Sequence, residues 1–220
     1  MAQWLRGRTS AVRDYCVFIP VVLVFAFNSL FNSQDIGVRH VLPALPLLCV
    51  VVAPVLTEPL RAVMRGGRRA IDVAAAGLVV LGLMWFAVGT LRIAPRYLEF
   101  FNEVAGGPAN GHQFLIDSNL DWGQDLIRLK HYMDAKGLQS VNLAYFGRVD
   151  PGVYGVRFVP LEEETSAHGP TVVSASFLMG RPYFWYVDGR MQWVKAGTYT
   201  WLQTRRPVDR VGSMFVYDLP

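Results

Sequence analysis

Long hydrophobic stretches alternate with short polar segments over the first 91 residues of the chain. The stretches cover residues 15–31, 41–57 and 71–91. A helix needs about 20 predominantly apolar residues to cross the hydrocarbon core of a bilayer. The pattern therefore predicts about three transmembrane helices within residues 1–91.

Two other interpretations remain open for the first two stretches. Arginines precede the first stretch, as in a signal peptide, although no small-x-small cleavage site follows it. The second stretch contains Pro43, Pro46 and Pro54, and its length gives a helix of only about 25 Å. The first two stretches could instead form a re-entrant hairpin.

The hydrophobic pattern changes after Leu91, where short apolar segments alternate with polar turns. We expect residues 92–220 to form one small mixed α/β domain. An amphipathic helix is expected over 92–104, a helix over about 122–136 with Asp121 as its N-cap and Gly137 as its stop, and a short helix over 183–187. The expected strands are 114–116, 141–146, 171–177 and 213–217. The first two of these strands, joined by the helix between them, predict a parallel pair.

The arginines predict how the chain crosses the membrane. Eight Arg, no Lys and four acidic residues precede Arg92, whereas residues 92–220 hold thirteen basic and thirteen acidic residues. Residues 1–14 and 58–70 are Arg-rich, whereas the 32–40 loop holds only Arg39. The positive-inside rule then places the N-terminus in the cytoplasm and the domain 92–220 outside it.

Composition excludes several classes of function. The neutral domain lacks the basic stripe that nucleic-acid binding requires, so no nucleic-acid partner is expected. The two cysteines, Cys16 and Cys49, lie in hydrophobic stretches and provide no disulfide for the domain. The four histidines are scattered without zinc-ligand spacing, so neither a metal nor a cofactor is expected.

The segment DSNLDWGQD, residues 117–125, is a candidate ligand loop between a predicted strand and a predicted helix. It does not fit a calcium hand, because its glycine is one place late and Arg128 occupies the twelfth position. The alternative is a structural helix start rich in acids and caps. The candidate contacts are Asp117, Asn119, Asp121, Trp122, Gln124 and Asp125.

The segment QDIGVRHVLPALP, residues 34–46, is expected at the outer membrane interface. Arg39 and His40 in this segment are candidate contacts for a lipid phosphate, because a guanidinium offers a planar fork to phosphate oxygens. The same pair could instead be an interfacial anchor that snorkels into the headgroup layer.

Four segments together resemble a known family. They are IGVRHVLPALP, YLEFFNEVAGGPANG, FLIDSNLDWGQDLIRLKHY and VNLAYFG. They resemble the C-terminal part of bacterial phospholipid-carrier-dependent glycosyltransferases of the GT-C superfamily, which are similar to protein O-mannosyltransferases and the aminoarabinose transferase. The resemblance covers residues 15–155 well and 160–220 only loosely.

The resemblance implies a multi-pass enzyme of the bacterial inner membrane. Such an enzyme transfers a sugar from a polyprenyl-phosphate carrier to an acceptor on the outer face. Arg39 and His40 occupy the place of a lipid-phosphate contact, whereas the family's N-terminal helices and catalytic first loop have no counterpart here. We expect the C-terminal portion of such an enzyme, inactive without an upstream catalytic polypeptide, with membrane lipid and a polyprenyl-phosphate sugar as partners.

Two other functions remain open. The chain could be a non-catalytic, membrane-anchored module that binds a glycan or a protein partner through the 117–125 loop. It could also be a structural membrane protein that assembles through the small residues of its third hydrophobic stretch, Gly77 and Gly82 among them.

Overall fold

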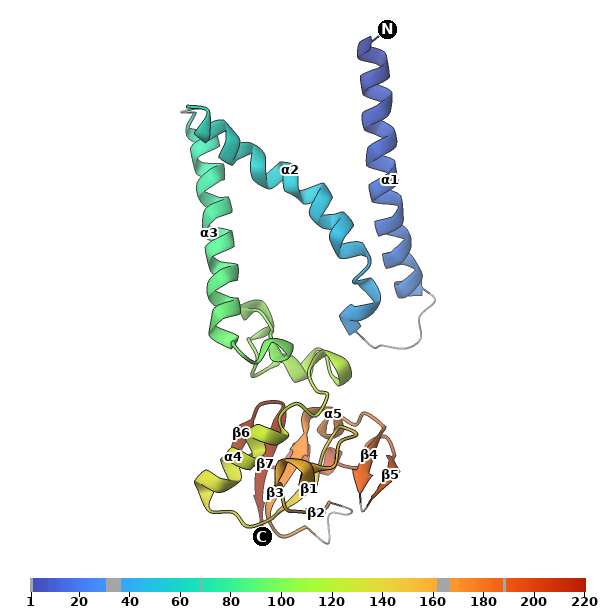
Figure 1. The fold of residues 1–220 in the computed structure, drawn as a ribbon, viewed down its shortest axis with the longest axis vertical. Coiled ribbons are helices and arrows are strands. Elements are labelled where there is room, and N and C mark those ends of the chain that lie inside the picture. Colours follow the sequence, from blue (N-terminus) through green and yellow to red (C-terminus); the bar gives the residue numbers. More distant parts are fainter. Residues whose placement is uncertain (1, 31–36, 68, 162–166, 188) are drawn as a thin grey trace. The chain divides into compact units, whose positions relative to one another are not determined.

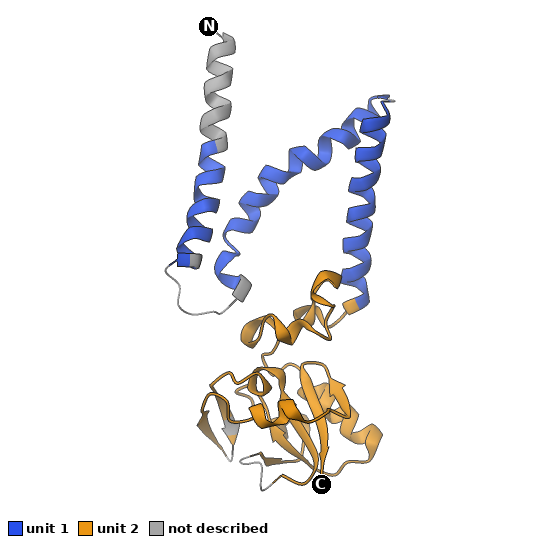
Figure 2. Cartoon of the chain, turned by 180° about the vertical axis from the view of Figure 1, so that it is seen from behind, with its two compact units in different colours: residues 1–92 blue, residues 93–220 orange. Residues whose placement is uncertain are grey.

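The computed structural model describes residues 2–30, 37–67, 69–161, 167–187 and 189–220. The chain divides into two compact units, residues 1–92 and residues 93–220 (Figure 2). This boundary lies one residue after the position 91/92 at which the hydrophobic pattern changes. Each unit is described below by itself.

In the part of the first unit that the structure describes, the α-helices are α1 (Ala2–Leu30), α2 (Ala44–Met64) and α3 (Ala70–Ile93) (Figure 1). A short 3-10 helix, Gly37–Val41, precedes α2. Residues 32–36 of the predicted outer loop 32–40 lie outside the described residues. α2 starts and ends later than the predicted stretch 41–57. It continues past its two internal prolines, Pro54 and Pro59, and ends at Met64.

Two of these helices are long and apolar enough to cross a membrane, namely α2 and α3. At about 1.5 Å per residue they measure about 32 Å and 36 Å, against a hydrocarbon core of about 30 Å. The apolar part of α1 is shorter, Tyr15–Asn28. Large apolar side chains on α2 and α3, such as Val55, Leu78 and Trp85, are exposed. A β-carbon added to Gly77 or Gly82 would meet nothing within 4 Å.

The second unit is built on a five-stranded sheet in the order β2-β1-β3-β7-β6. The strands are β1 (Val141–Ala144), β2 (Phe158–Pro160), β3 (Gly169–Ser174), β6 (Asp209–Val211) and β7 (Met214–Leu219). β1 is parallel to β2 and β3, whereas β7 is antiparallel to β3 and β6. The domain is therefore mixed α/β, as expected.

Helix α4 (Leu126–Lys136) packs on this sheet through Leu126, Leu129 and Met133, all of which are buried. Gly137 ends α4 in a left-handed conformation, as predicted. The N-cap prediction was wrong: α4 begins at Leu126, so Asp125 and not Asp121 precedes it. The short helix α5 (Ala175–Leu178) directly follows β3 and shortens the strand predicted over 171–177.

Three other predicted elements were wrong. Residues 183–187 form strand β4, which pairs with β5 (Arg190–Val194) in a separate hairpin, and not a helix. Residues 114–116 form no strand, so the parallel neighbours of β1 are β2 and β3. The helix expected over 92–104 is broken after Ile93, because Pro95 has no N–H donor and its ring clashes with a preceding helical turn. Short 3-10 turns replace it.

Candidate functional site

The 117–125 loop turns all three of its acidic side chains into the second unit. Asp117, Asp121 and Asp125 are buried, and Asn119 is half-buried. Trp122 is 53% exposed. The loop is therefore held from within, and its indole is the large group that it presents to solvent.

The turn between β6 and β7 donates hydrogen bonds to the carboxylate of Asp125. Its Oδ2 accepts hydrogen bonds from the backbone N–H of Ser213 (2.8 Å) and from the Ser213 hydroxyl (2.9 Å). Val211 pairs with Met214, so Gly212 and Ser213 form a two-residue hairpin turn. Gly212 has φ +58°, which such a turn favours at its first central position. This turn brings a segment 88 residues further along the chain onto the loop.

Asp121 is fully buried. Its Oδ1 accepts a hydrogen bond from the Gly123 N–H at 2.9 Å. No hydrogen bond reaches Oδ2 among the described residues, although the hydroxyls of Ser174 and Ser213 lie close enough to favour the charged form. Burial dominates and raises the pKa of Asp121 from 3.8 to about 7. This carboxyl group therefore exchanges its proton near neutral pH.

Asp117 anchors the start of the loop. Arg181 donates to its Oδ2 through Nε (3.0 Å) and Nη2 (2.9 Å), and its backbone N–H donates to the Ser176 hydroxyl at 3.0 Å. Its φ is +60°, a left-handed conformation that aspartate and asparagine tolerate better than most residues. Both partners come from the region just after β3, so the strand end fixes the loop start.

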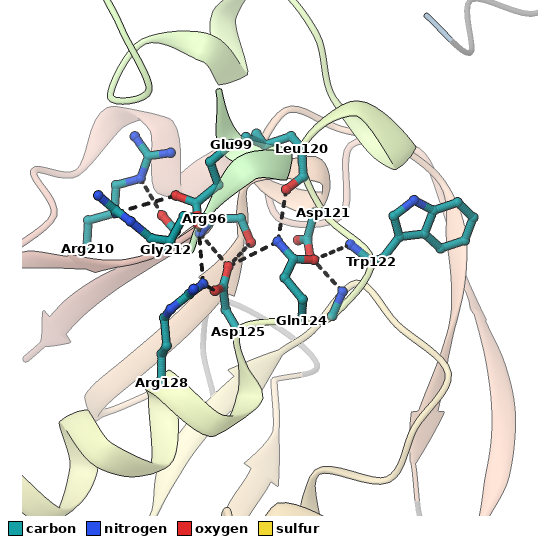
Figure 3. Close-up of polar contacts among 12 residues, drawn as sticks. Arg96, Glu99, Leu120, Asp121, Trp122, Gln124, Asp125, Arg128, Arg210 and Gly212 are labelled. Atoms are coloured by element: carbon teal, nitrogen blue, oxygen red, sulfur yellow. Dashed lines mark hydrogen bonds and ion pairs between the residues drawn. The ribbon is translucent and has the colours of Figure 1, made fainter. Parts of the chain in front are cut away.

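Gln124 closes the loop on itself. Its Oε1 accepts from the Trp122 N–H at 2.7 Å, and its Nε2 donates to the Leu120 carbonyl at 3.1 Å (Figure 3). Asn119 donates to the Ile116 carbonyl at 3.2 Å. These amides fix the backbone beneath the exposed Trp122 ring.

Sequence reasoning missed a group of residues beside the loop. The Glu99 side chain is only 2% exposed and lies between Arg96 (3.6 Å from Oε2) and Arg128 (3.5 Å from Oε1). Arg128 also contacts Asp125 (Figure 3). Burial raises the pKa of Glu99, and the nearby Asp125 carboxylate adds to this effect, while the arginines oppose it. The amphipathic helix expected over 92–104 gave no indication that Glu99 would be buried.

Arg39 and His40 lie together in the 3-10 helix Gly37–Val41, directly before α2. Arg39 is exposed and His40 is half-buried. Asn28 of α1 donates to the carbonyl of His40 at 3.2 Å and to that of Val24 at 2.8 Å, which ties the end of α1 to this turn. The His40 Nε2 is buried without a hydrogen-bond partner among the described residues. This pair belongs to the first unit, whereas the 117–125 loop belongs to the second.

No protein-family model, curated protein or solved structure matches this chain. The resemblance to phospholipid-carrier-dependent glycosyltransferases therefore rests on the sequence segments alone. Among the described residues, no group of three or more His, Cys, Asp or Glu side chains is arranged to hold a metal ion. The chemistry that these residues offer is anion contact by arginine and proton exchange by buried carboxyl groups.

Proposed function

We propose that this chain is the C-terminal portion of a bacterial inner-membrane glycosyltransferase that uses a polyprenyl-phosphate sugar. In this proposal the chain contributes a lipid-phosphate contact and an extracytoplasmic domain, while an upstream polypeptide carries the catalytic base. The observation that carries the proposal is the exposed Arg39 next to His40 at the start of α2, a helix long and apolar enough to span a bilayer.

Three features support a phosphate contact at this position. A guanidinium is always charged and pairs with phosphate oxygens through two parallel hydrogen bonds. The Nε2 of His40 is buried and has no hydrogen-bond partner in the described residues, which leaves its hydrogen-bonding capacity unused there. The Asn28 amide holds the backbone of His40, which limits the conformational entropy lost on binding.

Photocrosslinking of polyprenyl phosphate to the full chain in membranes tests this proposal. We expect labelling of the wild-type chain and a loss of about tenfold in Arg39→Gln, since hydrogen bonds to a charged group contribute about 1.5–3 kcal/mol. Arg65→Gln is the matched control, because Arg65 is also exposed but follows the other end of α2. Equal labelling of all three proteins would refute the Arg39 contact.

The exposed Trp122 favours a second candidate function, a membrane-anchored module that binds glycans. Aromatic rings stack on sugar faces, and this ring sits on a backbone fixed by Gln124. Binding of the full chain to a glycan array should be lost in Trp122→Ala. It should persist in Trp193→Ala, which removes another exposed indole, 55% accessible, from the β4–β5 hairpin. If the full chain bound no glycan on the array, the glycan-binding function would be refuted.

A further inference from the structure

A pocket of about 340 Å³ lies in the second unit beside the 117–125 loop. It is lined by Arg96, Glu99, Pro108, Ala109, Arg210 and Gly212. Two guanidinium groups and one carboxyl group thus face the same space. None of these residues belongs to the Arg39–His40 pair or to the exposed Trp122.

The charges around this pocket do not balance. Glu99 lies within ion-pair distance of both Arg96 and Arg128, and Arg128 also contacts Asp125. Asp125 is further satisfied by the backbone and hydroxyl of Ser213. Three arginines, counting Arg210, therefore surround two carboxyl groups, which leaves an excess of positive charge.

One nitrogen of Arg210 makes no hydrogen bond among the described residues. Its Nε donates to the Gly212 carbonyl (2.8 Å), its Nη1 donates to the Ala109 carbonyl (2.5 Å), and its guanidinium lies over the Phe215 ring (5.0 Å). Its Nη2 is buried and has no hydrogen-bond partner among the described residues. Burial lowers the pKa of Arg210; the nearby Glu99 and Asp125 carboxylates oppose this effect, and repulsion from Arg96 adds to it. A buried donor without an acceptor destabilises the folded state, and an anionic oxygen in the pocket would remove that penalty.

Arg96, one of the residues that line the pocket, closely follows a candidate membrane span in the chain. Arg96 is three residues beyond Ile93, the last residue of α3, and three residues extend at most about 11 Å. The polar headgroup layers add about 10–15 Å in total to the hydrocarbon core. If α3 spans a bilayer, Arg96 is within reach of the headgroup phosphates.

We propose that this pocket binds a phosphate group between Arg96 and Arg210, carried either by a lipid headgroup or by a soluble phosphomonoester. Planar guanidinium forks suit phosphate oxygens, and two of them can share one phosphate. Burial and the nearby Asp125 carboxylate raise the pKa of Glu99, whereas Arg96, Arg128 and Arg210 lower it.

Two probes of the full chain separate the sources of phosphate. Glycerol 3-phosphate is titrated calorimetrically into the chain in a maltoside detergent. In parallel, native mass spectrometry measures retained lipid after reconstitution in phosphatidylcholine nanodiscs with or without phosphatidic acid. Retention of phosphatidic acid without a glycerol 3-phosphate signal supports a headgroup site, and calorimetric binding supports a soluble phosphomonoester.

The variants decide whether the pocket is responsible. Arg96→Gln should weaken binding by about tenfold or more, and this substitution should leave the fold intact because the Arg96 side chain is 43% exposed. Arg206→Gln is the matched control, since Arg206 is exposed and does not line the pocket. The proposal is overturned if neither probe binds the wild-type chain, or if Arg96→Gln and Arg206→Gln bind like the wild type.

Discussion

Gly212 and the carboxylate of Asp125 are packed so closely that no side chain fits between them. A β-carbon at residue 212 would lie 2.3 Å from both Cγ and Oδ2 of Asp125. The absence of a side chain at Gly212 is therefore what lets the β6–β7 turn close over the start of α4. This contact joins the 117–125 loop to the last two strands of the sheet.

Replacement of Gly212 by alanine should destabilise the second unit strongly. The new methyl group meets a buried carboxylate that Ser213 and Arg128 hold in place, and φ is +58°. We expect a loss of about 2–4 kcal/mol in the free energy of unfolding, measured by urea titration of the full chain in detergent. The matched control is Gly137→Ala, where φ is +67° but nothing lies within 4 Å; only about 1 kcal/mol should be lost there. Similar losses in both variants would contradict the close contact.

The stability of the second unit should depend on the protonation of Asp121. Because folding raises the pKa of this group from 3.8 to about 7, the folded state binds its proton more tightly. The stabilisation is complete below the ordinary pKa and is lost as pH rises through the folded value. The gap between the two pKa values corresponds to about 4 kcal/mol at most.

The substitution Asp121→Asn isolates this effect, since asparagine stays neutral and keeps an oxygen for the Gly123 N–H. Between about pH 4 and pH 7, the difference in unfolding free energy should shift progressively in favour of the variant. A difference for Asp121→Asn that stays constant over this range would mean that the carboxyl group is ionised throughout.

Asp117 should tolerate asparagine better than alanine. Both substitutions lose the ion pair with Arg181, which is about one-third exposed and therefore partly screened by solvent. Asparagine accepts φ +60° more readily than alanine does, so Asp117→Ala should be less stable than Asp117→Asn by about 1–2 kcal/mol. At Asp134, inside α4, the order should reverse because alanine favours a helix. The same order at both positions would argue against a left-handed Asp117.

Cysteine accessibility tests the predicted topology. In a background with Cys16 and Cys49 replaced by serine, Arg206→Cys should react with a membrane-impermeant maleimide in intact cells. Arg65→Cys, in the Arg-rich 58–70 segment, should react only after the membrane is permeabilised. The opposite pattern would place the 93–220 unit in the cytoplasm and remove the extracytoplasmic role.

The parts of the fold visible in the sequence were those set by local patterns. The apolar stretch 71–91 matches α3 within two residues at each end, and Gly137 marks the end of α4. β4 was missed because its pairing with β5 depends on a partner strand, whereas aromatic residues alone do not distinguish a strand from a helix over five positions. Segments with strong local signals were predictable, and those defined by tertiary pairing were not.

The candidate site also combines features set by local sequence with features set by long-range contacts. The 117–125 loop stood out in the sequence, but its inward orientation depends on Ser176, Arg181 and Ser213, which are 59 to 88 residues away in the chain. The pocket lined by Arg96 and Arg210 was not foreseen, because Arg210 lies on β6, more than 100 residues further along the chain. The local sequence pattern identified the 117–125 segment, whereas long-range packing determined which of its side chains remain exposed.

The mass of the native assembly tests the central claim most directly. The protein would be captured from its source membranes with an antibody against residues 93–220 and measured by native mass spectrometry. The account predicts a mass well above the 24.6 kDa of this chain, either in one longer polypeptide or together with a catalytic partner. A species of 24.6 kDa without any co-purifying polypeptide would contradict the proposal that this chain is one portion of a larger glycosyltransferase.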